Sequence, residues 1–147
     1  MGTKIQSDQL EKIIPVIIKV TNTDLSTNSG SWVDIDSSLD ITATVPASGA
    51  VLITGSLDLK MTDQEDCFLG VGIGAADPAG INGGHAFDGT QRVGVPFGDI
   101  ITGLTPGSNT FKLHWQTTGS GTVTLEASGR GGAKEGSWWM VLPITGA

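Results

Sequence analysis

The chain has 147 residues, of which 22 are glycine, and its 8 Lys and Arg against 15 Asp and Glu give a formal net charge of −7. Binding to nucleic acid normally needs clustered Lys and Arg, so we expect no DNA or RNA partner. No stretch approaches the roughly 20 apolar residues of a membrane span, and no apolar run follows a basic start. We therefore expect one domain, made in the cytoplasm without a signal peptide and without a membrane partner.

Residues 1–15 differ in pattern from the rest of the chain and are predicted to form an N-terminal arm. Asp8 and Glu11 have the spacing of a capping box, and Pro15 would end the resulting helix after one or two turns. Such a short helix is marginal alone, so the arm needs a partner surface unless it is a disordered tail. The apolar residues expected to dock on that surface are Ile5, Leu10, Ile13 and Ile14.

From residue 16 to residue 147, apolar and polar residues alternate with a period of two, which is typical of half-buried strands. The predicted strands are 16–23, 32–35, 39–45, 51–59, 68–75, 92–102, 109–117, 122–127 and 137–144. Turns rich in Gly, Asn and Pro separate them. The sequence thus predicts an all-β domain over 16–147, an antiparallel two-sheet jelly roll or sandwich of about eight or nine strands.

The clearest pair of strands is 109–117 and 122–127, which the segment Gly-Ser-Gly separates. Trp115 falls on the apolar face of the first strand, and His114 falls on its polar face. Because glycine permits a tight reversal, we expect these two strands to form a hairpin.

Glycine occupies every second position at Gly70, Gly72 and Gly74, which leaves one face of that strand without side chains. We expect the other sheet, a bulky aromatic side chain or a neighbouring subunit to come close there. The following segment, 75–90, is the longest irregular stretch and is predicted to be an exposed loop.

Few residues favour catalysis. His85 and His114 are far apart in sequence, so a zinc site would need carboxylates as its other ligands. No serine has the surroundings G-x-S-x-G of a nucleophile elbow. Asp34, Asp36 and Asp40 could act as paired acids in glycoside hydrolysis, but their position beside a turn favours ordinary solvated carboxylates. We therefore expect no enzyme and no cofactor.

The acidic segment 63–66 could hold calcium through its oxygen atoms, but it lacks the Asp-x-Asp-x-Asp-Gly spacing of a calcium loop. A solvated turn is the preferred interpretation, and no metal site is assigned. Cys67 is the only cysteine, so no internal disulfide can form, and a small buried side chain at a strand start is expected.

Four tryptophans occur in a chain without tyrosine: Trp32, Trp115, Trp138 and Trp139. Trp138 and Trp139 are adjacent on a predicted strand, so they point to opposite faces. One of them should lie in the core, and the other should lie at the surface, in a subunit interface or on a ligand platform. An exposed indole could stack on a sugar ring.

Three segments carry a resemblance to a known family: GSWVDI at 30–35 ahead of the strand 39–45, PGSNTFKLHW at 106–115, and the closing strand 137–144. With them the chain resembles small jelly-roll domains of bacteriophage virion proteins, which are related in architecture to the trimeric heads of the tumour-necrosis-factor-like fold. The resemblance implies a homotrimer whose apolar faces meet around a threefold axis. The four tryptophans and the four apolar arm residues are the expected interface.

Such domains often follow a fibrous shaft, and no shaft, repeat or heptad is present in this sequence. The expected function is therefore a trimeric capsid decoration protein that stabilises the phage head in the virion. Its partners would be itself and the major capsid protein or other virion proteins. The alternative is a receptor- or carbohydrate-binding head of a phage fibre, in which an exposed tryptophan and the segment 75–90 would contact a glycan.

Overall fold

The protein is described by a computed structural model over residues 16–19, 23–63, 66–75, 78, 83–86, 92–126 and 137–145. Within these ranges the chain forms eleven strands and one short 3-10 helix. The strands are β1 (Val16–Lys19), β2 (Leu25–Thr27), β3 (Val33–Asp34), β4 (Ile41–Val45), β5 (Val51–Met61), β6 (Asp66–Ile73), β7 (Gly83–Ala86), β8 (Arg92–Ile101), β9 (Gly107–Thr117), β10 (Val123–Leu125) and β11 (Trp138–Pro143); the helix η1 is Ser37–Leu39.

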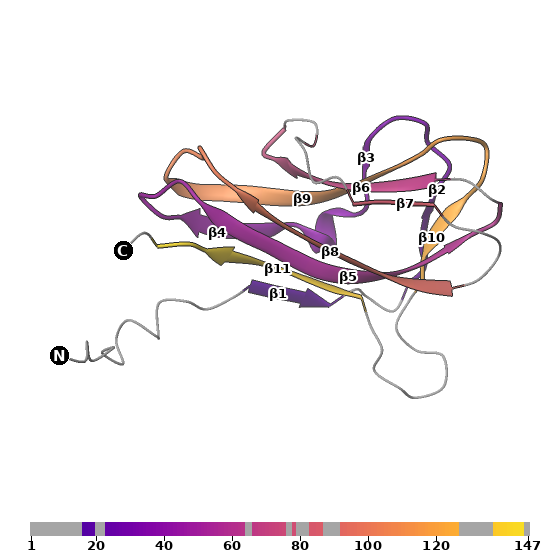
Figure 1. Ribbon diagram of the computed structural model, residues 1–147, viewed down its shortest axis with the longest axis horizontal. Helices are drawn as coiled ribbons and strands as arrows, with labels where there is room; N and C mark the ends of the chain where they lie inside the picture. The colour runs from indigo at the N-terminus through magenta and orange to yellow at the C-terminus, as the bar shows by residue number, and fades with distance from the viewer. Residues whose placement is uncertain are drawn as a thin grey trace.

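The strands form two antiparallel sheets that pack face to face (Figure 1). In the first sheet, β8 lies along one edge of β5, and β11 and β10 lie along the other edge, flanked by β1 and β2. In the second sheet, β6 separates β7 from β9, and β4 and β3 share the far edge of β9.

When strands that share one edge are taken as one position, the order is β1/β2, β11/β10, β5, β8 in the first sheet and β3/β4, β9, β6, β7 in the second. Consecutive positions along the chain thus alternate between the sheets, except that β6 and β7 are neighbours in the second sheet, and this is the order of an eight-stranded jelly roll. The predicted all-β, two-sheet architecture is confirmed.

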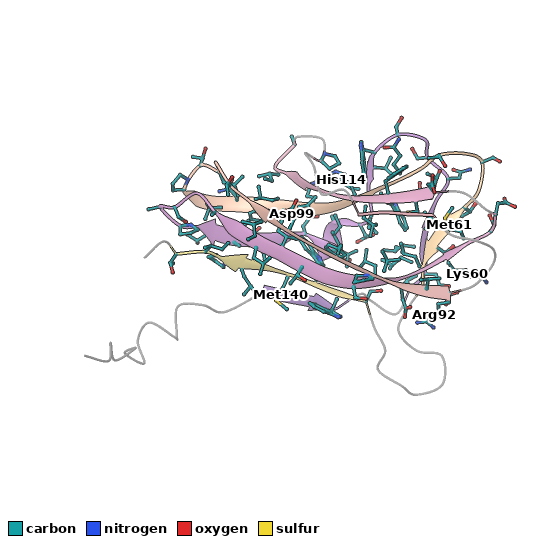
Figure 2. All side chains as sticks on the ribbon, in the orientation of Figure 1. Lys60, Met61, Arg92, Asp99, His114 and Met140 are labelled. Atoms are coloured by element: carbon teal, nitrogen blue, oxygen red, sulfur yellow. The ribbon has the colours of Figure 1, made fainter. Side chains whose placement is uncertain are left out.

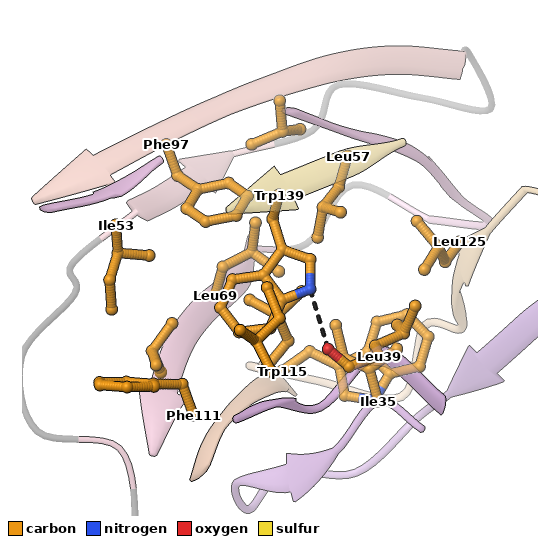
Figure 3. Close-up of a cluster of buried hydrophobic side chains, with 14 of the residues drawn as sticks. Ile35, Leu39, Ile53, Leu57, Leu69, Phe97, Phe111, Trp115, Leu125 and Trp139 are labelled. Carbon is orange, nitrogen blue, oxygen red and sulfur yellow. Dashed lines mark hydrogen bonds between the residues drawn. The ribbon is translucent and has the colours of Figure 1, made fainter. Parts of the chain in front are cut away.

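The core lies between the sheets because every second residue of the long strands points inward. Along β5 the inward residues are fully buried, and Phe111, Leu113 and Trp115 of β9 face them from the second sheet. The indole of Trp139 crosses this space, and its Nε1–H donates a hydrogen bond to the Leu39 carbonyl oxygen at 3.0 Å (Figure 3). This bond satisfies the one polar atom of a side chain with no exposed surface.

The predicted hairpin between 109–117 and 122–127 is wrong, because β9 belongs to the second sheet and β10 to the first. The segment between these two strands crosses the sandwich instead of reversing in one sheet. Its backbone is held at both ends: Thr118 N–H donates to the Asp66 carbonyl oxygen at 3.1 Å, and Thr122 N–H donates to Thr62 Oγ1 at 2.9 Å. Local alternation cannot distinguish the two outcomes, since it does not specify the pairing partner.

Three other expectations need correction. The segment 75–90 is not wholly a loop, because it contains β7, a strand of Gly, His and Ala whose backbone pairs with β6. The strand β2 has no counterpart among the predicted strands. The start of the predicted strand 39–45 is instead the end of η1, since Asp36 Oδ1 accepts a hydrogen bond from Ser38 N–H at 2.8 Å and caps a helical turn.

Candidate functional site

The outer face of the second sheet carries a cluster of four charged or titratable side chains, here called the charged cluster: Asp34, Asp40, Lys112 and His114. β3 pairs with β9 so that Asp34 lies directly opposite His114. His114 Nε2 forms an ion pair with Asp34 Oδ1, while Lys112 Nζ lies 3.0 Å from Asp34 Oδ2 and 3.7 Å from Asp40 Oδ2. Both oxygen atoms of Asp34 are therefore engaged.

The electrostatics of the charged cluster are those of a paired surface network. The hydrogen bond to Asp34, with the charges of Asp34 and Asp40, raises the pKa of Lys112 above its ordinary value. Asp36 takes no part, because its carboxylate caps η1, and the hydrogen bonds from Ser38 lower its pKa. The three acids that the sequence grouped as a possible catalytic set are thus divided between a lysine and a helix cap. Their arrangement favours a solvated, structural role over glycoside hydrolysis.

His114 lies on the polar face of β9 as expected, yet it is only 7% exposed. Its Nδ1 atom is buried and finds no hydrogen-bond partner among the described residues. No group of three or more His, Cys, Asp or Glu side chains in the described ranges is placed to hold a metal ion. The side chains of His85 and Glu65 lie outside the residues described in this detail.

An aromatic side chain approaches the glycine-rich strand, which is one of the three kinds of neighbour expected from the sequence. Gly70 lies opposite His114 in the β6–β9 pairing. A Cβ atom at Gly70 would lie 2.7 Å from Pro78 Cβ and 3.1 Å from Trp32 Cζ3, so only glycine leaves room for the indole. Trp32 remains partly exposed at this position. This partly exposed ring lies on the same outer face as the charged cluster, because Gly70 pairs with His114.

The four tryptophans separate into two classes. Trp115 and Trp139 are 1% and 0% exposed and belong to the core, whereas Trp32 and Trp138 are partly exposed. The prediction that one of the adjacent indoles lies in the core is thereby confirmed. A side chain without exposed surface cannot contribute contact area to a partner. Trp32 and Trp138 therefore remain as the interface candidates, while Ile5, Leu10, Ile13 and Ile14 lie outside the described residues.

A second surface, on the outer face of the first sheet, is apolar. Ile100, Leu52 and Leu142 lie side by side in register on β8, β5 and β11. Ile100 is 57% exposed, and the two leucines are partly exposed. Three more apolar residues continue the surface along the strands. We call the whole set the apolar stripe: Leu52, Pro96, Ile100, Trp138, Met140 and Leu142.

The same outer face becomes charged at its other end. Arg92 forms ion pairs with Asp58 and with Glu126, the latter at 3.4 Å from Nε to Oε2. Figure 2 shows Arg92 and Lys60 at that end, Met140 nearer the middle of this face, and His114 on the opposite side of the sandwich. At the charged end Arg92 is therefore paired with two acids, whereas in the apolar stripe Pro96 and Ile100 are exposed and the other four side chains are partly exposed.

Sequence reasoning missed the apolar stripe, although a signal was present. The strand 138–143 reads WWMVLP, apolar at both alternating sets of positions. In an antiparallel sheet one face is commonly solvated, so a strand that is apolar on both faces indicates a second covered surface. The described ranges contain no helix long and apolar enough to cross a membrane.

No protein-family model matches the sequence, and neither does any curated protein with which it was compared. Solved structures similar to the chain include the VP2 subviral particle of infectious bursal disease virus, with 14% identity and a TM-score of 0.49 over 93% of this chain and 39% of that one. The Gx strain of the same virus gives 15% identity and a TM-score of 0.48 over 90% and 37%. The chain thus spans less than half the length of these proteins, and likeness at this level does not specify a role.

Proposed function

We propose that the protein is a virion structural subunit, a homotrimeric decoration protein that attaches to the capsid of a bacteriophage. The observation that carries this proposal is the apolar stripe on the outside of a closed jelly roll. A contiguous exposed apolar surface on a folded domain commonly marks a site of association. The fold is compatible with this role because jelly rolls build many capsid and lectin domains, although a fold alone does not decide between them.

Solvent exposure identifies which of the tryptophans are suited to the trimer interface. Trp138 lies within the apolar stripe, and large aromatic side chains supply much of the binding energy at protein interfaces. Residues 1–15 are proposed to act as a separate attachment arm on the major capsid protein or a neighbouring subunit, with 16–147 as the jelly-roll domain. The site of action is then the assembled virion.

The test has two measurements on the full chain. Light scattering coupled to size-exclusion chromatography should give the mass of a trimer, and co-sedimentation with undecorated capsids should give saturable binding. A monomer at all concentrations would contradict the homotrimer. A trimer that fails to bind any capsid offered would contradict decoration while leaving assembly intact.

A carbohydrate-binding fibre head is the second candidate, and one specific observation favours it. The indole of Trp32 rests against Gly70, which pairs with His114 of the charged cluster, so an aromatic surface lies on the same face of the sheet as polar groups. Sugar-binding sites need both kinds of group, the ring for the apolar face of the sugar and the polar groups for its hydroxyls. A glycan array should give hits that Trp32→Ala removes. An array without hits for the native protein would reject this candidate.

A further inference from the structure

The apolar stripe is a surface suited to packing against another segment of protein. Its end row, Ile100, Leu52 and Leu142, spans three adjacent strands and therefore extends about 10 Å across the sheet. The next row along the strands adds Met140, beside Thr54 and Gly98, and the row after that adds Trp138 and Pro96 on either side of Ser56. None of these residues carries a charge, so a partner loses no ionic hydration by packing against them.

The register of β1 shows where the N-terminal arm begins. Val16, the first residue of β1, pairs with Val141, and β1 then runs antiparallel to β11 towards Trp138. The chain before Val16 therefore enters the sheet at the end where Leu142 and Ile100 lie. The start of the arm and the end row of the apolar stripe adjoin the same end of the sheet.

The arm has the composition of a suitable cover. Residues 1–15 contain Ile5, Leu10, Ile13 and Ile14, and their charges balance because Lys4 and Lys12 offset Asp8 and Glu11. The remainder of the chain holds the whole net charge of −7. Two copies repel each other overall, whereas an arm with no net charge meeting an uncharged stripe escapes that repulsion.

Length and backbone chemistry favour the stripe of another copy over the arm's own. Fifteen residues can span up to about 50 Å when extended, which is several times the width of the end row. A return over the same sheet would need a tight reversal directly before β1. Proline disfavours the helical backbone region in the residue before it, so the position of Pro15 opposes that reversal.

We propose that residues 1–15 of one copy pack on the apolar stripe of a neighbouring copy, so that the arm ties subunits together. This arrangement rests on the proposed homotrimer, and it specifies which surfaces meet. Exchange of arms around a closed ring leaves no stripe uncovered and no arm unused. It also makes the arm a determinant of assembly before any capsid is bound.

The experiment is disulfide trapping between differently tagged copies. One copy carries Ile13→Cys, the other carries Ile100→Cys, and the two are unfolded, mixed, refolded and oxidised together. Cys67 is 1% exposed and should not compete. The matched control replaces Ile100→Cys by Thr44→Cys, an exposed strand position on the outer face of the second sheet. We expect the 13–100 cross-link to exceed the 13–44 cross-link at least tenfold.

The outcomes separate this inference from the proposed function. Equal cross-linking at positions 100 and 44 overturns the arm exchange. A chain that carries both Ile13→Cys and Ile100→Cys and forms only an intramolecular disulfide overturns it as well. If light scattering still reports a trimer in those samples, the homotrimer stands and only the assignment of surfaces is wrong. If it reports monomers, both are wrong. An Ile100→Lys variant, at a position 57% exposed, should keep its melting temperature while its 13–52 cross-link, formed with Leu52→Cys, falls at least tenfold.

Discussion

Among the described glycines, Gly55 is the one at which an added Cβ atom would approach a neighbouring atom most closely. It lies on the inward face of β5, between Phe97 on β8 and Trp139 on β11. A Cβ atom there would lie 2.5 Å from the Trp138 carbonyl oxygen and 2.6 Å from Phe97 Cζ. The first of these is a backbone atom within a paired strand, which cannot move away without breaking the ladder. Glycine at this position lets two aromatic side chains meet in the core.

Gly55→Ala should therefore destabilise the protein by about 1–3 kcal/mol, the usual cost of overpacking. Thermal or urea denaturation followed by tryptophan fluorescence measures the change. The matched control is Gly94→Ala, where the added Cβ would meet only Ser56 Oγ, at 3.9 Å. If both variants melt at the same temperature, the close approach at Gly55 is not a constraint on stability.

Cys67 offers a second prediction at the same scale. Burial raises the pKa of its thiol from 9.0 to about 12. In the unfolded chain the thiol ionises above pH 9, while in the folded chain it stays neutral, so the folded state binds more protons between these values. The contribution of Cys67 to stability is complete below pH 9 and is lost as the pH rises towards 12, by up to about 1.4 kcal/mol per pH unit.

Urea unfolding of the native chain and of Cys67→Ala at pH 7.5, 9 and 10.5 tests this dependence, where the three pH values are chosen at about 1.5-unit steps to span the onset. The difference in unfolding free energy between the two proteins should stay constant up to pH 9 and then shift against the native chain. A thiol reagent should react with Cys67 only at the rate of unfolding. Rapid labelling under native conditions would contradict the burial of the thiol.

Among the strands, β11 contributes to both the core and the outer apolar surface. Its inward residues Trp139 and Val141 complete the core, while Met140 and Leu142 face outward in the apolar stripe. β1 pairs along its full length with β11, so the arm begins beside the strand that forms one side of that surface. One strand therefore connects the core, the outer face and the start of the arm.

Deletion of residues 2–13 should leave the jelly roll folded, because β1 begins only at Val16. The melting temperature of the domain should change little, while co-sedimentation with undecorated capsids should fall severalfold or more. Each Ile or Leu buried by the arm contributes roughly 1.5–3 kcal/mol before ordering costs. A chain with the same arm composition in scrambled order is the control. Equal capsid binding by deleted and full-length proteins would place attachment on the barrel itself.

At the scale of the whole molecule, the sandwich has two unlike outer faces. The face of the second sheet carries the charged cluster and Trp32, and the face of the first sheet carries the apolar stripe and Trp138. The two candidate functions use different faces. Substitution of one exposed tryptophan at a time therefore separates them.

Trp138→Ala should weaken the trimer by about 2 kcal/mol or more per interface, at least tenfold in dissociation constant, and leave any glycan binding unchanged. Trp32→Ala should remove any glycan binding and leave the trimer unchanged. Each variant is the control for the other, and a dilution series by light scattering with a parallel glycan array measures both properties. If neither variant changes the mass of the assembly in solution, neither tryptophan is a major contributor to the interface.

Sequence alone correctly predicted which residues of 109–117 face the core, because side-chain direction along a strand is a local property of its pleated backbone. Trp115 is buried for that reason, and so is one member of the pair Trp138 and Trp139. The close approach of an aromatic side chain to Gly70 was also predictable, since a strand without side chains leaves space that another group fills. The parts of the fold that the sequence pattern predicted correctly are thus mainly local ones, such as the direction of side chains along a strand.

The pairing of strands was decided only by the tertiary structure. β9 and β10 read as a hairpin yet lie in opposite sheets, and β7 is a strand despite its unpromising composition, because backbone hydrogen bonds connect residues far apart in sequence. The same holds for the candidate surfaces. Ile100, Leu52 and Leu142 come from three separate segments and form one apolar row only after β8, β5 and β11 have paired in register. Alternation along a strand determines the face of the sheet to which a side chain points, whereas long-range pairing of strands determines which residues become its neighbours.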